Sequence, residues 1–380
     1  MEPVTHFLTG ACIGRTGFNR KTTYATLAAV LAAEAADLDV LWGFAGPVEE
    51  LKHHRGITHT FVGAPAVAGV VLGAIWLFHR WQKARKPDAQ IGGHGVVSHR
   101  KQPGLPDLHW GWVYVTALVA ALSHILLDWL NNYGVRPFFP FSAHWYAGSI
   151  VFIAEPVFWA LLLLALVMPW LLGLADREIG VRKKPFRGQG WAIFALTGMA
   201  LVGLGRWVEY AQGVALLKNS PVASERVERV ALEPYPVNPF HWHAILETKD
   251  FYQTAEVDTW NGTVESNPET DVMYKPAVTP AVQAAKQTFL GRVYLDWGKW
   301  AVVRDVGQEP APGIKPPKLP PGQTWTTVEF TDLRFNYPFL GTQSGTGRTP
   351  LAGWVYIVDG RYDAGEVMDG RGQEPPSGRF

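Results

Sequence analysis

Residues 110–128 read WGWVYVTALVAALSHILLD, a long apolar run with no acidic or basic side chain except His124 and the final Asp128. A helix needs about 17–25 apolar residues to cross the roughly 30 Å of hydrocarbon in a bilayer. The run therefore predicts a membrane-spanning helix. It also predicts a functional site, because His124 and Asp128 are four residues apart and would lie on one stripe of that helix.

Three further stretches have the same character, namely residues 60–78, 150–175 and 190–205. Charged residues make up 18% of the chain and aromatic residues 13%, with 17 tryptophans, which is typical of a protein whose solvent is partly lipid. We expect an α-helical multi-pass membrane domain with about four spans. Residues 22–36 are Ala-rich, short and poor in Leu, so we expect a re-entrant or partly buried N-terminal helix there.

From about Pro234 the pattern changes to short runs that alternate or are rich in β-branched and aromatic residues. The clearest runs are residues 241–247, 291–296, 325–330 and 353–358. Asn-Gly, Asp-Gly and proline-rich turns separate them. We expect a mostly antiparallel β extramembrane domain. The predicted boundaries are 1–210 for the transmembrane helical metal-binding domain, 211–233 for a linker, 234–368 for the β-rich domain and 369–380 for a disordered tail.

Basic residues gather in the loop after the first predicted span and in the loop after the third. By the positive-inside rule these two loops are cytoplasmic. The remaining loop and everything after about residue 207 would then lie on the opposite side. We therefore expect a bacterial inner (cytoplasmic) membrane protein with its C-terminal β domain in the periplasm.

Charge and cysteine content restrict the kind of site. The formal net charge of +1 gives no reason to expect a nucleic-acid partner. The single cysteine, Cys12, excludes a multi-cysteine zinc site, so any metal must be held by His, Asp and Glu.

Candidate metal ligands fall at the ends of predicted helices that would share one face of the bilayer. They are His6, Asp37, Asp39, His54, His59, His124 and Asp128. Ionisable groups at membrane depth are costly unless they are paired or functional, and a divalent cation offsets the cost of several carboxylates. This ligand set fits Zn²⁺ best, with Mn²⁺ or Fe²⁺ as alternatives.

Other interpretations of these residues stay open. His124 and Asp128 would, on the structural interpretation, form a buried ion pair that ties helices together. Asp39 or Glu155 is the candidate general base. Arg55 is either an anion clamp for a phosphate-like group or the structural partner of a carboxylate.

The pieces that carry these residues resemble the YdjM-type family of bacterial inner-membrane proteins, which are described as metal-dependent hydrolases. The matching pieces are Thr5-His6, Ala36-Asp37-Leu38-Asp39, His54-Arg55-Gly56-Ile57-Thr58-His59, His124-Ile-Leu-Leu-Asp128 with the following Asn-Asn-Tyr-Gly, Pro140-Phe-Ser and, more loosely, Asn238-Pro-Phe-His-Trp. The family is in turn distantly similar to zinc-dependent phospholipase C and P1-type nucleases. That likeness rests on the His-x-x-x-Asp element and implies hydrolysis of a phosphate ester.

These observations support two functions from different classes. The first is a membrane-embedded, metal-dependent hydrolase that cleaves a phosphoester, with a phospholipid or lipid-linked substrate drawn from the bilayer. The alternative is a non-catalytic envelope protein with a structural metal and a partner-binding β domain. A transporter is a weaker third possibility, since the chain has no evident repeats and its polar residues gather at one face.

Overall fold

The computed structural model describes residues 1–85, 106–178, 188–222, 227–340 and 349–373. The chain divides into two compact units. The helical unit contains Met1–Leu38 and Arg55–Arg206, and the β-rich unit contains Asp39–His54 and Trp207–Phe380. The short segment 39–54 thus belongs to the second unit, although both of its neighbours in sequence belong to the first.

Four long apolar helices of the described chain could cross a membrane by length and composition. They are α4 (Gly63–Arg85), α5 (Trp110–Leu130), α6 (Pro156–Glu178) and α7 (Gln189–Lys218). The predicted multi-pass helical fold is therefore confirmed. α6 begins later than predicted, at a proline that suits the first position of a helix. Glu155, which we expected inside this span, consequently precedes it.

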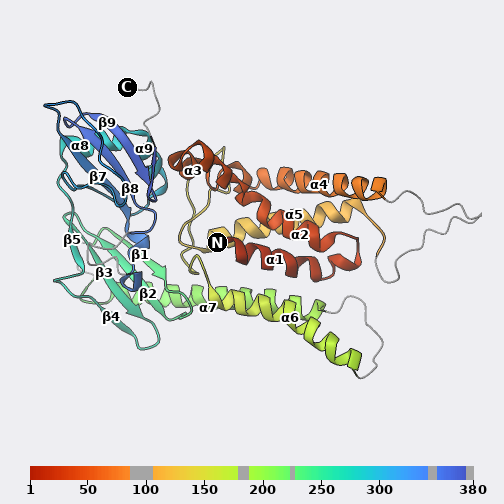
Figure 1. The fold of residues 1–380 in the computed structure, drawn as a ribbon. Coiled ribbons are helices and arrows are strands. Elements are labelled where there is room, and N and C mark those ends of the chain that lie inside the picture. The colour runs from red at the N-terminus through yellow and green to blue at the C-terminus, as the bar shows by residue number, and fades with distance from the viewer. Residues whose placement is uncertain (86–105, 179–187, 223–226, 341–348, 374–380) are drawn as a thin grey trace, which may run out of the picture. The chain divides into compact units, whose positions relative to one another are not determined.

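The N-terminal helices α1 (Pro3–Arg15) and α2 (Ala25–Ala35) pack beside α4 and α5 (Figure 1). α1 and α2 approach closely because Gly10 and Gly14 face the backbone of α2. A Cβ at Gly10 would lie 2.7 Å from the carbonyl oxygen of Ala29. Ala28, Ala29 and Ala32 are fully buried in the same interface. Small residues at such an interface let helices in a membrane make close van der Waals contact.

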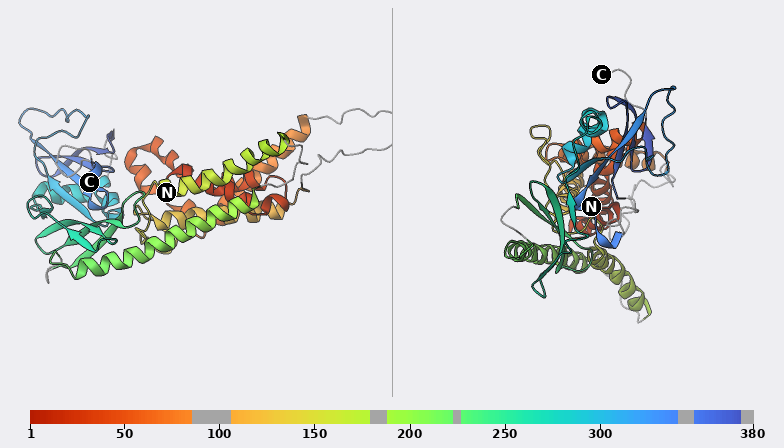
Figure 2. Two further views of the ribbon diagram at one scale, coloured as in Figure 1. Left: turned by 90° about the horizontal axis from the view of Figure 1, so that it is seen from below. Right: turned by 90° about the vertical axis from the view of Figure 1, so that its left-hand side faces the viewer.

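The β-rich unit contains two antiparallel sheets. The first has the order β1-β2-β3-β4, with β5 paired to β3, and the second has the order β10-β9-β8-β7-β6. The strands of the first are β1 (Arg229–Pro234), β2 (His241–Glu247), β3 (Phe251–Asp258), β4 (Thr263–Glu265) and β5 (Val272–Tyr274). Those of the second are β6 (Ala301–Asp305), β7 (Trp325–Asp332), β8 (Gly353–Val358), β9 (Tyr362–Met368) and β10 (Arg371–Gln373). Ile245 of the first sheet packs with Trp300, Val302 and Leu333 beside the second, and the two sheets lie next to each other (Figure 2).

The strand predicted at residues 291–296 is wrong. These residues form part of helix α9 (Phe289–Trp297), which follows α8 (Pro280–Gln287). Thr288 begins α9 by accepting a hydrogen bond from the N–H of Gly291 (3.1 Å). Leu290, Tyr294 and Trp297 then recur at helical spacing and are buried. A short apolar run fits either period, and here the N-cap decides for the helix.

Two predicted boundaries also differ from the observed elements. The linker expected at 211–233 contains the end of α7 and most of β1. The tail expected at 369–380 contains β10, which pairs with Glu366–Met368 of β9. Most of the basic residues that carried the orientation argument lie outside the described residues, as do 374–380.

The segment 39–54 is held within the β-rich unit by specific contacts. It ends in helix α3 (Pro47–His53). The Arg371 guanidinium lies 2.6 Å from a carboxylate oxygen of Glu50, and the N–H of Val48 donates to the side chain of Gln373 at 3.2 Å. Strand β10 thus contacts a segment more than three hundred residues away in sequence.

Candidate metal centre

Four of the predicted ligands converge in the helical unit. Asp37 comes from a 3₁₀ segment that continues α2, His59 from a 3₁₀ turn just before α4, and His124 and Asp128 from the last turns of α5. One ligand atom from each lies within 4.8 Å of all the others. His59, His124 and Asp128 are fully buried, and the Asp37 side chain is 17% exposed. We call these residues the four-residue centre.

The separations within the centre are short and regular. Nε2 of His59 lies 3.2 Å from Oδ1 of Asp37 and 3.4 Å from Oδ2 of Asp128. Nε2 of His124 lies 3.5 Å from the first of these oxygens and 3.3 Å from the second. When ligands lie about 2.0–2.1 Å from a tetrahedral ion, as in zinc sites, they are about 3.3–3.4 Å from one another. The four imidazole–carboxylate separations match that ligand spacing, and all four atoms lie within 4.8 Å of one another, so they could surround one ion.

The backbone fixes which nitrogen of His124 faces this centre. Its Nδ1 lies 2.6 Å from the carbonyl oxygen of Ala33 and must donate a hydrogen to it. In the neutral ring, Nε2 then carries a lone pair directed at the two carboxylates. This arrangement is typical of metal-binding histidines, whose second nitrogen is held by an outer acceptor.

Positive charge is required inside the centre. Within the described residues, Nε2 of His124, Oδ2 of Asp37 and Oδ2 of Asp128 have no hydrogen-bond partner. Burial alone would raise the pKa of the Asp37 carboxyl, but the neighbouring imidazoles of His124 and His59 hold it well below its usual range. Two ionised carboxylates among imidazole lone pairs need either protons on the rings or a cation. The chemistry of the donors and their spacing both fit a divalent metal.

The other oxygen of Asp128 faces cationic groups. Nη2 of Arg55 lies 2.9 Å from Oδ1, and the terminal amine of Met1 contacts the same atom. Arg55 also donates to the carbonyl oxygen of Gly134 (2.7 Å) and lies over the ring of Tyr133. Arg55 is thus placed as a partner of a candidate ligand, which is one of the two roles expected for it.

His6 lies against the centre from α1. Its ring stacks on that of His124 with centroids 3.7 Å apart, and its Nε2 lies 3.5 Å from Oδ1 of Asp128. Burial and the neighbouring His124 lower the pKa of His6 to about 3, so the ring is neutral at physiological pH. A neutral imidazole is the form that binds metal.

Asp39 and His54 are paired with each other. Oδ1 of Asp39 lies 3.0 Å from Nδ1 of His54, and both residues belong to the β-rich unit. Glu155 lies 3.0 Å from the guanidinium of Arg206, and both side chains are buried. The four-residue centre includes none of these three predicted site residues, so their roles stay predictions.

Glu34 was missed by the sequence reasoning. Burial, followed by the charge of Asp37, raises the pKa of Glu34 to about 7, and Glu34 also interacts electrostatically with His124. A carboxyl with such a pKa suits general acid–base chemistry. The signal was present in the sequence, because Glu34 precedes Asp37 by three residues on a helical stripe.

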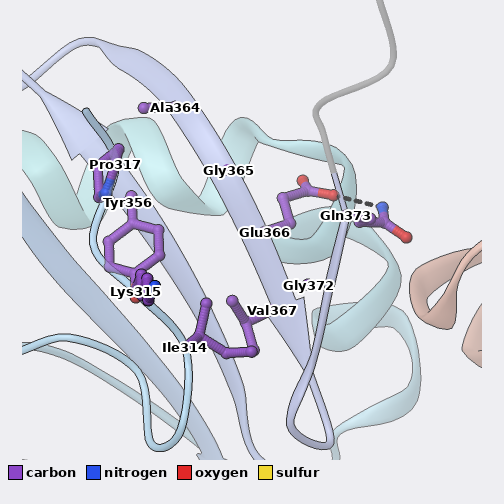
Figure 3. Close-up of a pocket in the computed structure, with 10 residues that line it drawn as sticks. All are labelled: Ile314, Lys315, Pro317, Tyr356, Ala364, Gly365, Glu366, Val367, Gly372 and Gln373. Carbon is purple, nitrogen blue, oxygen red and sulfur yellow. Dashed lines mark hydrogen bonds between the residues drawn. The ribbon is translucent and has the colours of Figure 1, made fainter. Parts of the chain in front are cut away.

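A separate, shallow pocket lies on the second sheet of the β-rich unit (Figure 3). Its volume is about 250 Å³, and Ile314, Tyr356 and Val367 form its apolar part. The Glu366 carboxylate at its edge accepts hydrogen bonds from Gln373 (2.9 Å) and from the N–H of Leu290 (2.7 Å). These bonds make Glu366 a structural residue that joins β9, β10 and α9.

Comparison with known proteins gives a family for the chain. The YdjM inner membrane protein family matches residues 1–212, more than half of the 380 residues and all of the four-residue centre. The uncharacterized protein YfhP of Bacillus subtilis (strain 168) is 24% identical over 165 residues, which is 41% of this chain and 42% of YfhP. The chain thus matches less than half of that relative's length, and no solved structure matches. The resemblance predicted from the sequence is confirmed, and the chain belongs to the YdjM inner membrane protein family.

Proposed function

We propose that this protein is a membrane-embedded, metal-dependent hydrolase that cleaves a phosphoester of a lipid or lipid-linked substrate. The observation that carries the proposal is the convergence of Asp37, His59, His124 and Asp128, with ligand atoms 3.2–3.5 Å apart across four imidazole–carboxylate pairs. The described family and the four apolar helices support the inner membrane as the location. We also propose that the β-rich unit is periplasmic, from the distribution of basic residues in the loops.

The residues of the centre would hold a divalent ion, for which we propose Zn²⁺, with Mn²⁺ or Fe²⁺ as alternatives. When bound, such an ion polarises a phosphoryl oxygen and acidifies water, which is the chemistry that ester hydrolysis needs. Arg55 keeps Asp128 oriented by holding its outer oxygen. His6 packs on the ring of His124 and is placed to add a further nitrogen donor.

A proton acceptor completes the proposal. The sequence suggests Asp39 or Glu155, and the structure adds Glu34, whose raised pKa suits the role. Arg55 would stabilise negative charge on the substrate if it moves from Asp128 to the phosphate. The likeness to zinc-dependent phospholipase C and P1-type nucleases stays a prediction.

A structural metal is the second candidate, and one observation favours it. Four protein ligands around one ion would fill a four-coordinate shell, as in structural zinc, whereas catalytic zinc keeps an open position. In that case the protein would be a non-catalytic envelope protein whose β-rich unit binds a partner. Catalysis would need one ligand to leave the ion so that water could bind, and Asp37 is the least buried of the four.

The test uses the purified full chain in detergent, loaded in turn with Zn²⁺, Mn²⁺ and Fe²⁺. We expect hydrolysis of a phosphodiester or phospholipid that falls at least a hundredfold in Asp128→Ala. Glu34→Gln, Asp39→Asn and Glu155→Gln would then identify the base as the variant that keeps its metal but loses about 10²–10⁴ in rate. A metal-replete wild type with no turnover above Asp128→Ala would contradict the enzyme and support the structural metal.

A further inference from the structure

Among the exposed large apolar side chains of the helical unit, five lie in the segments 57–62 and 138–141. Phe141 is 84% exposed, and the others are between 48% and 54% exposed. The set, which we call the aromatic rim, is Ile57, Phe61, Val62, Phe138 and Phe141. Exposed apolar side chains that occur singly need no explanation, but a group of this size marks an interaction surface.

The rim is built from two segments that contact each other, and the first of them contains His59. Phe61 and Val62 lie between His59 and the first residue of α4. Phe138 and Phe141 lie in the connection after α5, whose last turns carry Asp128. The N–H of Phe61 donates to the carbonyl oxygen of Pro137 at 2.9 Å, and the rings of Phe61 and Phe138 meet edge to face at 5.4 Å. The two segments therefore form one surface beside the centre.

Continuity with a membrane span indicates what covers this surface. Val62 directly precedes α4, whose own exposed side chains include Val70, Trp76 and Leu77. Helices of 23 and 21 residues, α4 and α5, are about 32–35 Å long, so their ends reach the bilayer interface. Aromatic side chains concentrate at that depth in membrane proteins.

The charge pattern points the same way. Residues 56–79 and 137–154 contain no Asp, Glu, Lys or Arg, although the second stretch is mostly a connection between two spans rather than a span. Several of its N–H groups are bonded, including those of Phe139, Phe141 and Tyr146, which donate to the carbonyl oxygens of Arg136, Phe138 and Val135. An uncharged connection rich in aromatic residues suits the bilayer interface.

From this geometry we propose that the aromatic rim lies in the bilayer interface and binds the acyl region of a membrane lipid whose phosphate reaches the four-residue centre. The inference rests on the proposed function for the identity of the reacting group. The position of the rim in the bilayer interface can be tested whether or not the protein hydrolyses an ester. The alternative occupant, a second copy of the chain, is an outcome of the test.

The first experiment measures location in vesicles. Phe141→Cys is labelled with an environment-sensitive dye, which is selective because the only native cysteine, Cys12, is buried. Val278→Cys, at a 63% exposed position in the β-rich unit, is the matched control. We expect brominated phosphatidylcholine to quench at least half of the emission at position 141, and aqueous iodide to quench position 278 instead. Strong iodide quenching at 141, or lipid quenching that appears only after dilution separates protein copies, would overturn the proposal.

The second experiment measures substrate preference with Phe141→Asp, which leaves packing intact because Phe141 is largely exposed. The rate ratio between a phospholipid in vesicles and a water-soluble phosphodiester should fall at least tenfold, whereas Val278→Asp should not change that ratio. An unchanged ratio in Phe141→Asp overturns the substrate part. If wild type cleaves neither ester, the proposed function fails, and quenching at position 141 alone decides whether the rim binds lipid.

Discussion

Two clusters in this protein place imidazoles against carboxylates, and they differ in the number of carboxylates that each imidazole faces. In the helical unit, His59 and His124 each lie within 3.5 Å of both Asp37 and Asp128. In the β-rich unit, His241 and His243 share the single carboxylate of Glu256, at 3.1 and 3.0 Å. The two clusters therefore differ in the number of carboxylate charges that their imidazoles face.

Each oxygen of Glu256 has its own imidazole neighbour, and β2 sets this arrangement because His241 and His243 are two residues apart on one face of the strand. Protonation of one imidazole balances the single carboxylate charge of this cluster, although Nε2 of His243 has no hydrogen-bond partner within the described residues. In the four-residue centre, two carboxylate charges face the same two imidazoles and need either protons on the rings or a cation. Convergence of two carboxylates on the same imidazoles, rather than composition, makes the first cluster a candidate metal centre.

The largest expected effect is the loss of metal from one cluster only. His124→Ala should reduce bound metal at least tenfold, because it removes a ligand and the ring that Ala33 orients. His243→Ala, which removes a fully buried imidazole from the other cluster, should leave metal content unchanged. Elemental analysis of the purified chains measures both. Equal losses of metal in the two variants would show that the two clusters do not differ in metal binding.

A second, smaller effect is the response of metal affinity to acid. His59 and His124 must be neutral to bind a cation, so protons compete with the metal. Between pH 7 and pH 6 we expect the apparent affinity to fall, by at most about tenfold for each proton displaced. Titration against a chelating dye at several pH values measures this fall. A flat affinity from pH 8 to pH 6 would mean that the imidazoles are not ligands.

Much of the helical architecture could be predicted, because lipid imposes a strong and simple pattern on sequence. The runs that became α4 and α5 are recognisable from their length alone, and the i,i+4 spacing of His124 and Asp128 placed both on one stripe. The choice between Asp37 and Asp39 could not be predicted. The two residues are adjacent in pattern, but the chain passes into the β-rich unit between them, where Asp39 meets His54.

The β-rich unit was less predictable for a different reason. Short apolar runs carry little periodicity, so residues 291–296 fit a strand as well as a helix, and the N-cap at Thr288 decides for α9. The segment 39–54 joins the β-rich unit through contacts with Arg371 and Gln373. No local pattern encodes contacts over that sequence distance. Glu34, in contrast, was recognisable from its spacing to Asp37.

The smallest expected effect is on stability. Acid should strengthen the pair of His241 and Glu256, whereas it should weaken metal binding at the four-residue centre. The hydrogen bond with Glu256 raises the pKa of His241, so its stabilising contribution is complete below the unfolded pKa and disappears as pH rises through the folded pKa. Burial alone would raise the pKa of Glu256, but hydrogen bonds with His241 and His243 lower it, so its contribution disappears as pH falls through that lowered pKa.

The pair should therefore stabilise the β-rich unit most between the unfolded values of about 4.5 and 6.5. His241→Gln should cost about 0.2–1 kcal/mol near pH 5.5, since the pair is partly exposed, and less at pH 8. Hydrogen exchange in β2 and β3, corrected for intrinsic rates, measures this difference. Over the same pH interval, acid should weaken metal binding at the four-residue centre and strengthen the His241–Glu256 pair. Protons compete with a cation for the imidazoles of the centre, whereas a proton on His241 strengthens its bond with Glu256. A greater cost of His241→Gln at pH 8 than at pH 5.5 would remove that contrast between the two clusters.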